Sequence, residues 1–478
     1  MSMEPLALLP EICLLAGAVV ALLAGSFLPR RRQWITRLVA VAALLASAVS
    51  AGAGMAGEAR TVFETTFAVD TPTGIARLVI AVATLLVLGL GVDELDGSPR
   101  ESETYALLLL SALGAVVMAG ASDLLILAVG YLLASIPLYA LVGLERSPAA
   151  AEAALKTYLL GALLGITMLL GVTMLYGIGG ATAYAELADG LATAPPAALA
   201  VGVVGVLAGL MFKAGGVPGH FWVPDAAQGA GTTAAAFLTT VPKVGALVAA
   251  YRLLDALPRT VDWPLLVALL AAASMTLGNL AAFAQTDPRR LLGWSTVSQV
   301  GYLLLPVAVA GRSDLALPSL LFYLAAYAVT NLAAFAVVAA VPEHRNLAAY
   351  RGLAAAHPWV AGALLVSLLS LLGTPPTAVF VGKLTTFTAA WDGGAAWLAV
   401  VAAVNTVASL YYYLRWLAPA YRGGTSDDRA GAPAEPAAAA FSPRPWAAGT
   451  AVAAAAGILV LGVASGALWT LVDGPLAR

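Results

Sequence analysis

Charged residues are scarce in this sequence of 478 amino acids. They make up 10% of the chain, whereas soluble domains contain about a quarter. Hydrophobic residues make up 61%, and the mean hydropathy is +0.90, so the composition excludes an ordinary water-soluble fold. The formal net charge of −2 provides neither a basic surface for nucleic acid nor an acidic tail. We therefore expect the partners to be other membrane subunits and the lipid bilayer.

Cysteine is almost absent, because Cys13 is the single thiol of the sequence. One thiol can build neither an internal disulfide, nor an iron–sulfur cluster, nor a Cys-based zinc site. The sequence thus predicts no metal and no cofactor in this chain. The segment Gly52-Ala-Gly54-Met-Ala-Gly57 has the glycine spacing of a dinucleotide-binding loop, but no strand precedes it. We therefore do not expect this chain itself to bind NADH.

Long apolar runs make up most of the sequence. Runs of about 20 residues, the length that crosses a hydrocarbon core of ~30 Å, recur along almost the whole chain. Backbone groups in lipid must be satisfied internally, so the runs are expected to be helices. The sequence predicts an all-α integral membrane protein with about fourteen transmembrane helices. They are expected near residues 5–28, 34–54, 72–92, 104–120, 122–143, 155–177, 196–216, 226–254, 263–284, 290–311, 315–340, 358–388, 393–419 and 446–472.

Arginine marks one side of the expected membrane protein. Because cytoplasmic loops are rich in Lys and Arg, the cluster from Arg30 to Arg37 places the loop after the first span in the cytoplasm. Alternate loops carry further arginines, namely Arg146, Arg289, Arg290, Arg345, Arg351, Arg422, Arg429 and Arg444. Both termini are then expected outside the cytoplasm of a bacterial cell. The acidic loop from Asp93 to Glu103 fits this orientation poorly, although acidic residues count little in the rule.

Two spans are interrupted by glycine and proline, at Gly216-Val-Pro218 in the seventh span and Gly373-Thr-Pro-Pro376 in the twelfth. Matched interruptions in two halves of a chain are typical of inverted-repeat transporters. Five spans separate them, which predicts broken helices 7 and 12 within repeats formed by spans 4–8 and 9–13. The expected domains are an N-terminal three-helix segment (1–103), a first repeat (104–254), a second repeat (255–419), a cytoplasmic linker (420–445) and a C-terminal helix (446–478).

Five basic residues lie at membrane depth, where a charge costs a few kcal/mol unless it is compensated. They are Lys156, Lys213, Lys243, Lys383 and His220, and we expect them to face one polar interior. A buried lysine can exchange a proton when a nearby charge moves, and His220 could pass protons between Lys213 and Lys243. Two alternatives stay open: Lys156 could extend to the headgroups, and His220 could be a hydrogen-bonded core residue.

Polar residues also recur on the apolar helices. They could hold the waters of a hydrated path, or they could join helices to one another through hydrogen bonds. The residues are Asn279, Thr296, Ser298, Gln299, Asn331, Thr385, Thr386 and Asn405.

The segment from Phe212 to Asp225, Phe212-Lys-Ala-Gly-Gly-Val-Pro-Gly-His-Phe-Trp-Val-Pro-Asp225, resembles the seventh helix of the antiporter-like subunits of respiratory complex I. Gly229-Ala-Gly-Thr-Thr233 and Val241-Pro-Lys243 resemble the eighth helix. Leu9-Pro-Glu-Ile12 and Tyr411-Tyr-Tyr-Leu-Arg415 are similar to subunit N in particular. The chain is thus identified by resemblance, over nearly its whole length, with subunit N of bacterial NADH-quinone oxidoreductase.

This resemblance implies a membrane-arm subunit that moves protons while quinone is reduced in other subunits. Lys213 corresponds to the central channel lysine, Lys243 to the connecting lysine and Lys383 to the basic residue of the outlet, and Lys156 also matches a family lysine. The chain would be part of an NADH:quinone oxidoreductase, a translocase, without a redox site of its own. FMN, iron–sulfur clusters and quinone are expected on partner subunits.

The chain departs from the family pattern at three positions. Leu132, in Gly130-Tyr-Leu-Leu-Ala-Ser-Ile-Pro-Leu-Tyr139, stands where the family has a channel-facing glutamate that pairs with the lysine of helix seven. Gly231 replaces a usual proline, and Gln299 replaces a common histidine. These departures suggest a divergent or second-copy subunit N.

Two alternatives therefore stay open. One is a structural or assembly subunit that pumps no protons, and the other is a subunit of a cation/proton antiporter or membrane-bound hydrogenase. The sequence leaves undetermined the quinone, whether sodium replaces protons, and whether the complex keeps an NADH-oxidising arm.

Overall fold

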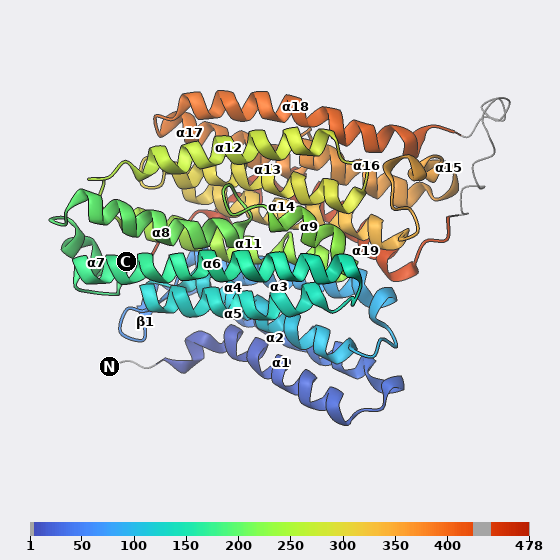
Figure 1. Cartoon of the computed structure of the whole chain (residues 1–478), viewed down its shortest axis with the longest axis horizontal. Coiled ribbons are helices and arrows are strands. Elements are labelled where there is room, and N and C mark those ends of the chain that lie inside the picture. The colour runs from blue at the N-terminus through green and yellow to red at the C-terminus, as the bar shows by residue number, and fades with distance from the viewer. Residues whose placement is uncertain (1–3, 424–440, 478) are drawn as a thin grey trace.

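The computed structural model describes residues 4–423 and 441–477, which fold into one bundle of nearly parallel helices (Figure 1). Helices α1 (Leu9–Phe27) and α2 (Trp34–Gly54) form one edge, and α18 (Ala396–Tyr421) forms the opposite edge. The most buried helices are α11 (Val241–Ala256), α13 (Pro288–Ala308) and α14 (Ala316–Ala340). The core of the protein is therefore made by helices from the middle of the chain.

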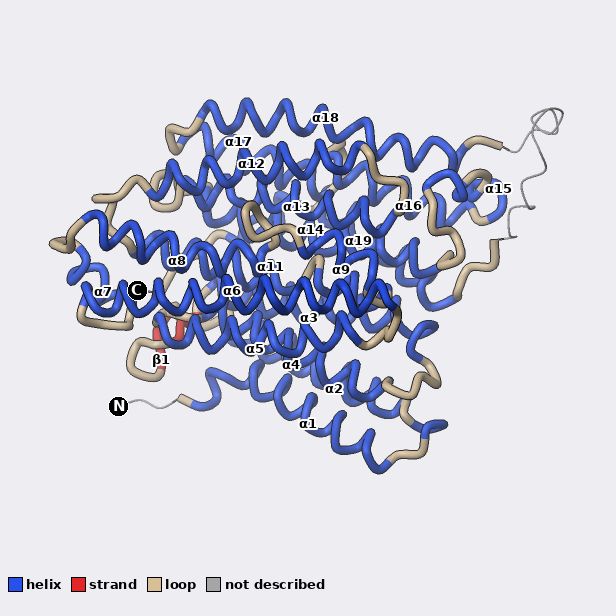
Figure 2. The backbone as a smooth tube through the Cα atoms, in the orientation of Figure 1, coloured by secondary structure: helices blue, strands red, loops and turns tan. Residues whose placement is uncertain are grey.

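The remaining elements are almost all helical, as Figure 2 shows. The other helices are α3 (Thr71–Leu95), α4 (Glu101–Gly120), α5 (Leu124–Gly143), α6 (Pro148–Gly179), α7 (Tyr184–Leu191), α8 (Pro196–Ala214), α9 (Trp222–Gly229), α10 (Thr232–Leu238), α12 (Trp263–Phe283), α15 (Leu353–Ala356), α16 (Pro358–Leu372), α17 (Ala378–Asp392), α19 (Pro445–Val463) and α20 (Ser465–Val472). Three short 3₁₀ helices are η1 (Pro5–Leu8), η2 (Arg30–Arg32) and η3 (Leu347–Tyr350). Strands β1 (Arg60–Val62) and β2 (Phe67–Val69) pair antiparallel, with Arg60 opposite Val69.

The predicted all-α membrane fold is confirmed. Among the described residues, thirteen helical segments are long and apolar enough to cross a membrane, and α16 with α17 forms one further, interrupted span. The single helix expected over 226–254 is wrong. Its first residues belong to α9, and α10 and α11 are separated at Thr239 and Thr240. Pro242 lies in the first turn of α11 and has no N–H, so it cannot continue the helix that begins at Thr232.

The predicted breaks in spans seven and twelve are confirmed and share one geometry. Helix α8 is followed by Gly215 with φ +80°, and α16 is followed by Gly373 with φ +89°. Each glycine donates its N–H back to carbonyls in the last turn, an arrangement that favours glycine because other residues resist positive φ. The domain boundaries stay predictions, and most of the expected linker, residues 424–440, lies outside the described residues.

The two ends of the bundle differ in charge. The N- and C-terminal ends lie together with β1 and α7 at the left of Figure 1, and α15 lies at the right. Because α2 leads to β1 and α6 leads to α7, the arginine-containing loops before α2 and before α6 lie at the α15 end. The arginines of these two loops therefore lie at one end, as the sequence predicted, whereas Arg60 in β1 lies at the opposite end. That the α15 end faces the cytoplasm stays a prediction.

The first two acids of the segment expected as an acidic loop, Asp93 and Glu94, lie in the last turn of α3 and have a structural explanation. Asp93 accepts a hydrogen bond from the backbone N–H of Ala447 in the first turn of α19, at 3.0 Å. Glu94 accepts the N–H groups of Thr232 and Thr233 in the first turn of α10, at 2.9 and 2.8 Å. The first N–H groups of a helix have no partner within the helix, and carboxylates are favourable there. These acids thus cap helices, which is compatible with their position at the arginine-rich end.

The C-terminal segment returns to the N-terminal part of the chain. Helix α19 packs against α3 and α14, with Asp93 capping its start. At the other end of α3, Asp70 accepts the backbone N–H of Ala477 at 2.9 Å and pairs with Arg252 of α11 at 2.8 Å. The end of the described chain is therefore fastened to both ends of α3.

Candidate proton pathway

Lys213 lies in the last turn of α8 and its side chain is fully buried. Its Nζ has no hydrogen-bond partner among the described residues. The ammonium group instead faces two aromatic rings, at 5.1 Å from the centroid of Tyr131 and 5.9 Å from that of Phe212. An aromatic face attracts a cation electrostatically, but more weakly than a carboxylate does. Lys213 is thus a buried amine without an anionic partner in the described part of this chain.

Among the described residues no carboxylate pairs with Lys213, and the structure corrects the position of Leu132. We expected position 132 to face the channel lysine, and this is wrong. Leu132 points away from the core and is 41% exposed, whereas its neighbour Tyr131 is buried against Lys213. Successive residues of a helix are about 100° apart around its axis, so Tyr131 and Leu132 cannot both face the same amine.

Lys243 begins α11, directly after the break that follows α10, and is fully buried. Its Nζ donates to the carbonyl of Leu238, the last residue of α10, at 3.4 Å. A Cβ added to Gly215, the glycine that ends α8, would lie 3.3 Å from this nitrogen. Lys243 therefore stands where the breaks of spans seven and eight meet.

Lys383 repeats this arrangement in the second half of the chain. Its side chain lies against Gly373, and its Nζ donates to the carbonyls of Leu372 and Leu371 at 3.0 and 3.2 Å. The ring of Tyr302 lies 4.2 Å from the same nitrogen. The last carbonyls of a helix lack intrahelical partners and carry partial negative charge, so they favour a cation. Lys243 and Lys383 thus each occupy the C-terminal end of an interrupted helix.

A chain of polar contacts begins beside Lys243 at the end of α10. Asn331 of α14 donates to the hydroxyls of Thr239 and Thr240, at 3.1 and 2.8 Å. Tyr327, also on α14, donates to the carbonyl of Thr239 at 2.8 Å and to the hydroxyl of Thr296 on α13 at 3.1 Å. The polar groups therefore cross from the first repeat into the central helices.

A second set of polar contacts on α14 and α13 leads to Lys383. Tyr323, one turn before Tyr327 on α14, donates to Gln299 Oε1 at 2.6 Å. Gln299 Nε2 donates to the carbonyl of Leu371 at 2.9 Å, the same oxygen that accepts from Lys383. Side chains that are fully or almost fully buried therefore line a route between the two lysines.

The other polar residues divide into two groups. Asn279 donates to Asn405 at 2.9 Å and accepts from Ser298 at 2.9 Å, so these three residues join α12, α13 and α18. Thr385 and Thr386 donate to carbonyls of their own helix. The helix-joining alternative therefore holds for the first group, and neither threonine contributes to the route.

His220 lies in the loop between α8 and α9 and is buried. Its ring stacks against Phe221 at 4.2 Å and Trp294 at 5.7 Å, and its Nδ1 has no hydrogen-bond partner among the described residues. No hydrogen bond of the described residues joins it to Lys213 or Lys243. Its role in passing protons between these lysines stays a prediction.

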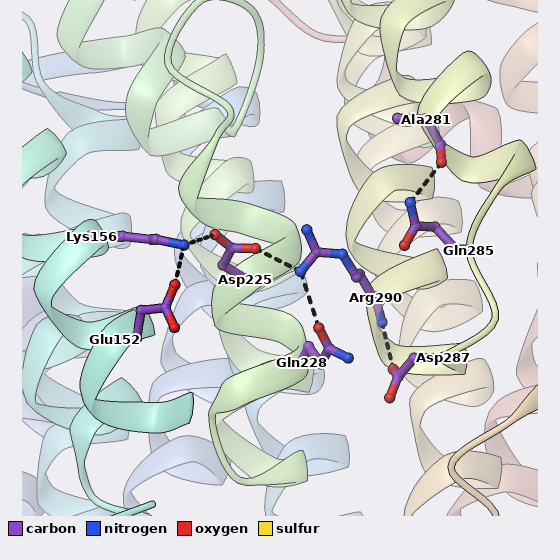
Figure 3. A network of polar contacts seen from close by, with 8 residues as sticks. All are labelled: Glu152, Lys156, Asp225, Gln228, Ala281, Gln285, Asp287 and Arg290. Atoms are coloured by element: carbon purple, nitrogen blue, oxygen red, sulfur yellow. Dashed lines mark hydrogen bonds and ion pairs between the residues drawn. The ribbon is translucent and has the colours of Figure 1, made fainter. Parts of the chain in front are cut away.

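Lys156 does not share the buried interior, and that expectation is wrong. Its side chain is 44% exposed and pairs with Glu152 at 2.5 Å and with Asp225 of α9 at 2.8 Å (Figure 3). Asp225 also pairs with Arg290 of α13 at 2.6 Å, and Arg290 donates to Gln228 at 3.0 Å. Lys156 therefore belongs to a partly exposed charge network that links three helices.

Sequence reasoning missed two buried ion pairs. Arg77 of α3 pairs with Glu11 of α1 at 2.7 Å, and Arg252 pairs with Asp70 as described above. Arg77, Glu11 and Arg252 lie within apolar runs, so the rule that singled out the lysines would also have found them. The aromatic rings that face the lysines gave no such signal, because aromatic residues are ordinary in membrane helices.

A family model described as "NADH:quinone oxidoreductase/Mrp antiporter, TM" matches residues 121–409, more than half of the chain. The NADH-quinone oxidoreductase subunit N of Mycobacterium sp. (strain JLS) is 60% identical over 98% of this chain and 99% of its own length. The chain belongs to the subunit N family of NADH-quinone oxidoreductases. Subunit N 1 of Streptomyces griseus is 54% identical over 97% of this chain and 96% of its own length.

A solved structure of respiratory complex I from Thermus thermophilus with bound aureothin contains a chain of the same fold. It is 32% identical, with a TM-score of 0.82, over 98% of this chain and all of that chain. The departures at Leu132 and Gly231 therefore do not remove the chain from the subunit N family.

Proposed function

We propose that this subunit N family member translocates protons through Lys213, Lys243 and Lys383, driven by quinone reduction in other subunits of an NADH-quinone oxidoreductase. The observation that supports the proposal is the placement of these amines at breaks of spans seven, eight and twelve. Buried polar groups on α13 and α14 lie between two of them, Lys243 and Lys383. Helix breaks at membrane depth provide backbone carbonyls that can hold a cation while its proton is exchanged.

The distribution of lysine and arginine supports this role. The sequence contains four lysines, and three of them are buried without a carboxylate among the described residues. The buried cations that do have carboxylate partners at these depths are the arginines Arg77 and Arg252. Arginine does not lose its proton in proteins, whereas a buried lysine can. The chain thus has arginine in fixed ion pairs and lysine where a proton must be released.

The assembly follows from family membership. The chain is a multi-pass membrane-arm subunit, and its partners are the other membrane subunits of the complex in a bacterial cell membrane. Within the proposal, FMN, iron–sulfur clusters and quinone reside on partner subunits, and the arginine-rich end faces the cytoplasm. His220, beside the break in span seven, would connect Lys213 and Lys243 through water.

A second candidate is a structural subunit of the same complex that moves no protons. It is favoured by the missing carboxylate at Lys213, since a charge shift between a lysine and a paired acid cannot occur there within the described chain. Both candidates share the fold, the membrane and the partners, and they differ only in proton transfer.

Variants of the assembled complex distinguish the two candidates. Lys213→Ala and Lys383→Ala should lower the number of protons moved per quinone reduced in sealed vesicles, because each removes an exchangeable amine. Arg60→Ala, which removes an exposed cation, is the control and should leave the ratio unchanged. An unchanged ratio in both lysine variants would favour the structural candidate.

A further inference from the structure

We propose that Asp225 is a positioning residue, which holds the short helix α9 so that Trp222 separates Lys213 from Lys243. The inference rests on the proposed proton transfer and adds a control point to it. We call Asp225, Lys156, Arg290 and Gln228 the α9 clamp. Figure 3 shows this clamp between α6 on one side and α13 on the other.

The clamp fixes α9 through charge-assisted contacts. Asp225 accepts from Lys156 at 2.8 Å and from Arg290 at 2.6 Å, through different carboxylate oxygens. Arg290 also donates to Gln228, one turn further along α9, at 3.0 Å. A helix of eight residues has few hydrogen bonds of its own and is only marginally stable alone. Its position therefore depends on what holds it from outside.

The backbone of α9 also packs closely against α6 on one side and α13 on the other. A Cβ on Gly229 would lie 2.6 Å from the carbonyl oxygen of Ala149 on α6. A Cβ on Gly293 of α13 would lie 2.7 Å from Cα of Pro224. Helix α9 is thus seated between two helices at backbone distance, and the clamp crosses the same gap.

Trp222 lies three residues before Asp225, on the inner side of α9, and is fully buried. Its Nε1 donates to the carbonyl of Phe212 at 3.1 Å, and the two rings are 5.2 Å apart. Lys243 Nζ lies 6.0 Å from the centroid of Trp222, and Lys213 Nζ lies 5.9 Å from that of Phe212. Phe212 and Trp222 therefore form an aromatic partition between the two amines.

The partition has a consequence for proton transfer. The rings of Phe212 and Trp222 have no lone pair that could accept a proton. Transfer between Lys213 and Lys243 therefore requires water molecules to enter the space that the partition occupies. A shift of α9 also moves Trp222, because Trp222 and Asp225 lie on the same short helix. The charge state of the clamp would thus decide whether the two amines communicate.

Proton yield in the assembled complex tests the function of the clamp. Asp225→Asn should lower the protons moved per quinone at an unchanged rate of quinone reduction, because a partition that is no longer held in place lets protons pass back between the two amines. Asp225→Glu should restore most of the yield. In a Trp222→Leu background, Asp225→Asn should add nothing, since residues that act through one another are not additive. An equal further loss in that background, or an unchanged yield in Asp225→Asn alone, would overturn the proposal. Asp392→Asn, at the exposed end of α17, is the matched control.

Hydrogen exchange tests the position of α9 independently of proton transfer. In the purified complex, Asp225→Asn should speed exchange of the α9 amides on the order of tenfold, because a local opening becomes easier. Arg290→Gln should do the same if Asp225→Asn does not assemble. Unchanged exchange would overturn the clamp even if Lys213→Ala abolishes proton transfer. Faster exchange together with an unaffected Lys213→Ala variant would contradict the proposed function and leave the clamp standing.

Discussion

The Nζ of Lys213 lies 5.1 Å from the centre of the Tyr131 ring, on a helix where the family has a carboxylate one residue later. A cation over an aromatic face gains about 0.5–2 kcal/mol, depending on how dry the site is. Tyr131 thus provides part of the stabilisation that a paired acid would give. It does so without a carboxylate, so under the proposed function Lys213 would exchange its proton with water or with another amine.

Replacing Tyr131 tests this relationship. Tyr131→Leu should slow proton transfer roughly two- to thirtyfold, the range that corresponds to a loss of ~0.5–2 kcal/mol. Tyr131→Phe keeps the ring and loses the contacts of the hydroxyl, including the one to the carbonyl of Gly161 at 3.3 Å, so it should transfer protons like the parent. The measurement is the initial rate of proton uptake into sealed vesicles. Equal slowing in both variants would show that the hydroxyl, not the ring, matters.

The ion pair of Asp70 and Arg252 predicts a dependence of stability on pH. Burial alone would raise the pKa of Asp70, but the adjacent Arg252 guanidinium and the N–H groups of Ala477 and Thr73 together lower it below its ordinary value. The folded pKa is then below the unfolded value of about 3.9. The pair therefore stabilises the protein above about pH 4, and this contribution is lost as the pH falls through the folded pKa.

Asp70→Asn should remove this contribution at neutral pH. Breaking a buried pair from one side costs about 3–5 kcal/mol, since the arginine stays buried. The midpoint of thermal unfolding of the purified protein in detergent should fall at pH 7, and the gap to the parent should narrow as the pH is lowered below 4. Asp392→Asn is the matched surface control. A gap that stays constant between pH 7 and pH 3 would contradict the assignment.

The surroundings of Gly231 explain why glycine stands where the resemblance to the family led us to expect proline. Its backbone, with φ −58° and ψ 153°, suits a proline, and that of Ala230 suits the residue before one. A Cβ at position 231 would, however, lie 2.6 Å from Glu94 Oε1. The carboxylate that caps α10 thus occupies the space that the proline ring would need.

Gly231→Pro should therefore displace Glu94 and lower stability by about 0.5–2 kcal/mol, the usual range for losing a helix cap. In a Glu94→Ala background the same change should cost nothing further. The measurement is the midpoint of thermal unfolding of the parent, the two single variants and the double variant. A loss of equal size in both backgrounds would show that the backbone, rather than Glu94, excludes proline.

Much of the fold could be predicted because the signals are local. Apolar length determines the spans, glycine and proline mark the breaks after Lys213 and before Lys383, and arginine marks one end of the bundle. The division between α10 and α11 was missed because the break at Thr239 and Thr240 has no glycine. Pro242 was the sequence signal for this break.

The candidate pathway was predicted less completely, because burial depends on partners from distant parts of the chain. Lys213, Lys243 and Lys383 were found as cations in apolar runs, and the same reasoning wrongly included Lys156. Its partner Asp225 lies 69 residues away, and only the folded chain brings α9 beside α6. Tyr131, Trp222 and Tyr302 could not be distinguished from other core aromatics by sequence alone.

The attachment of α19 to α3 has a consequence for biosynthesis. Synthesis proceeds at about 5–20 residues per second, so roughly 20 to 70 seconds separate the insertion of α3 from the appearance of α19. During that interval Asp93 lacks the hydrogen bond from the N–H of Ala447, and the side of α3 that α19 will cover faces lipid or an insertion factor. The bundle can close only after α19 has been made, so release of the chain before α19 would leave a subunit that is inserted but open along α3.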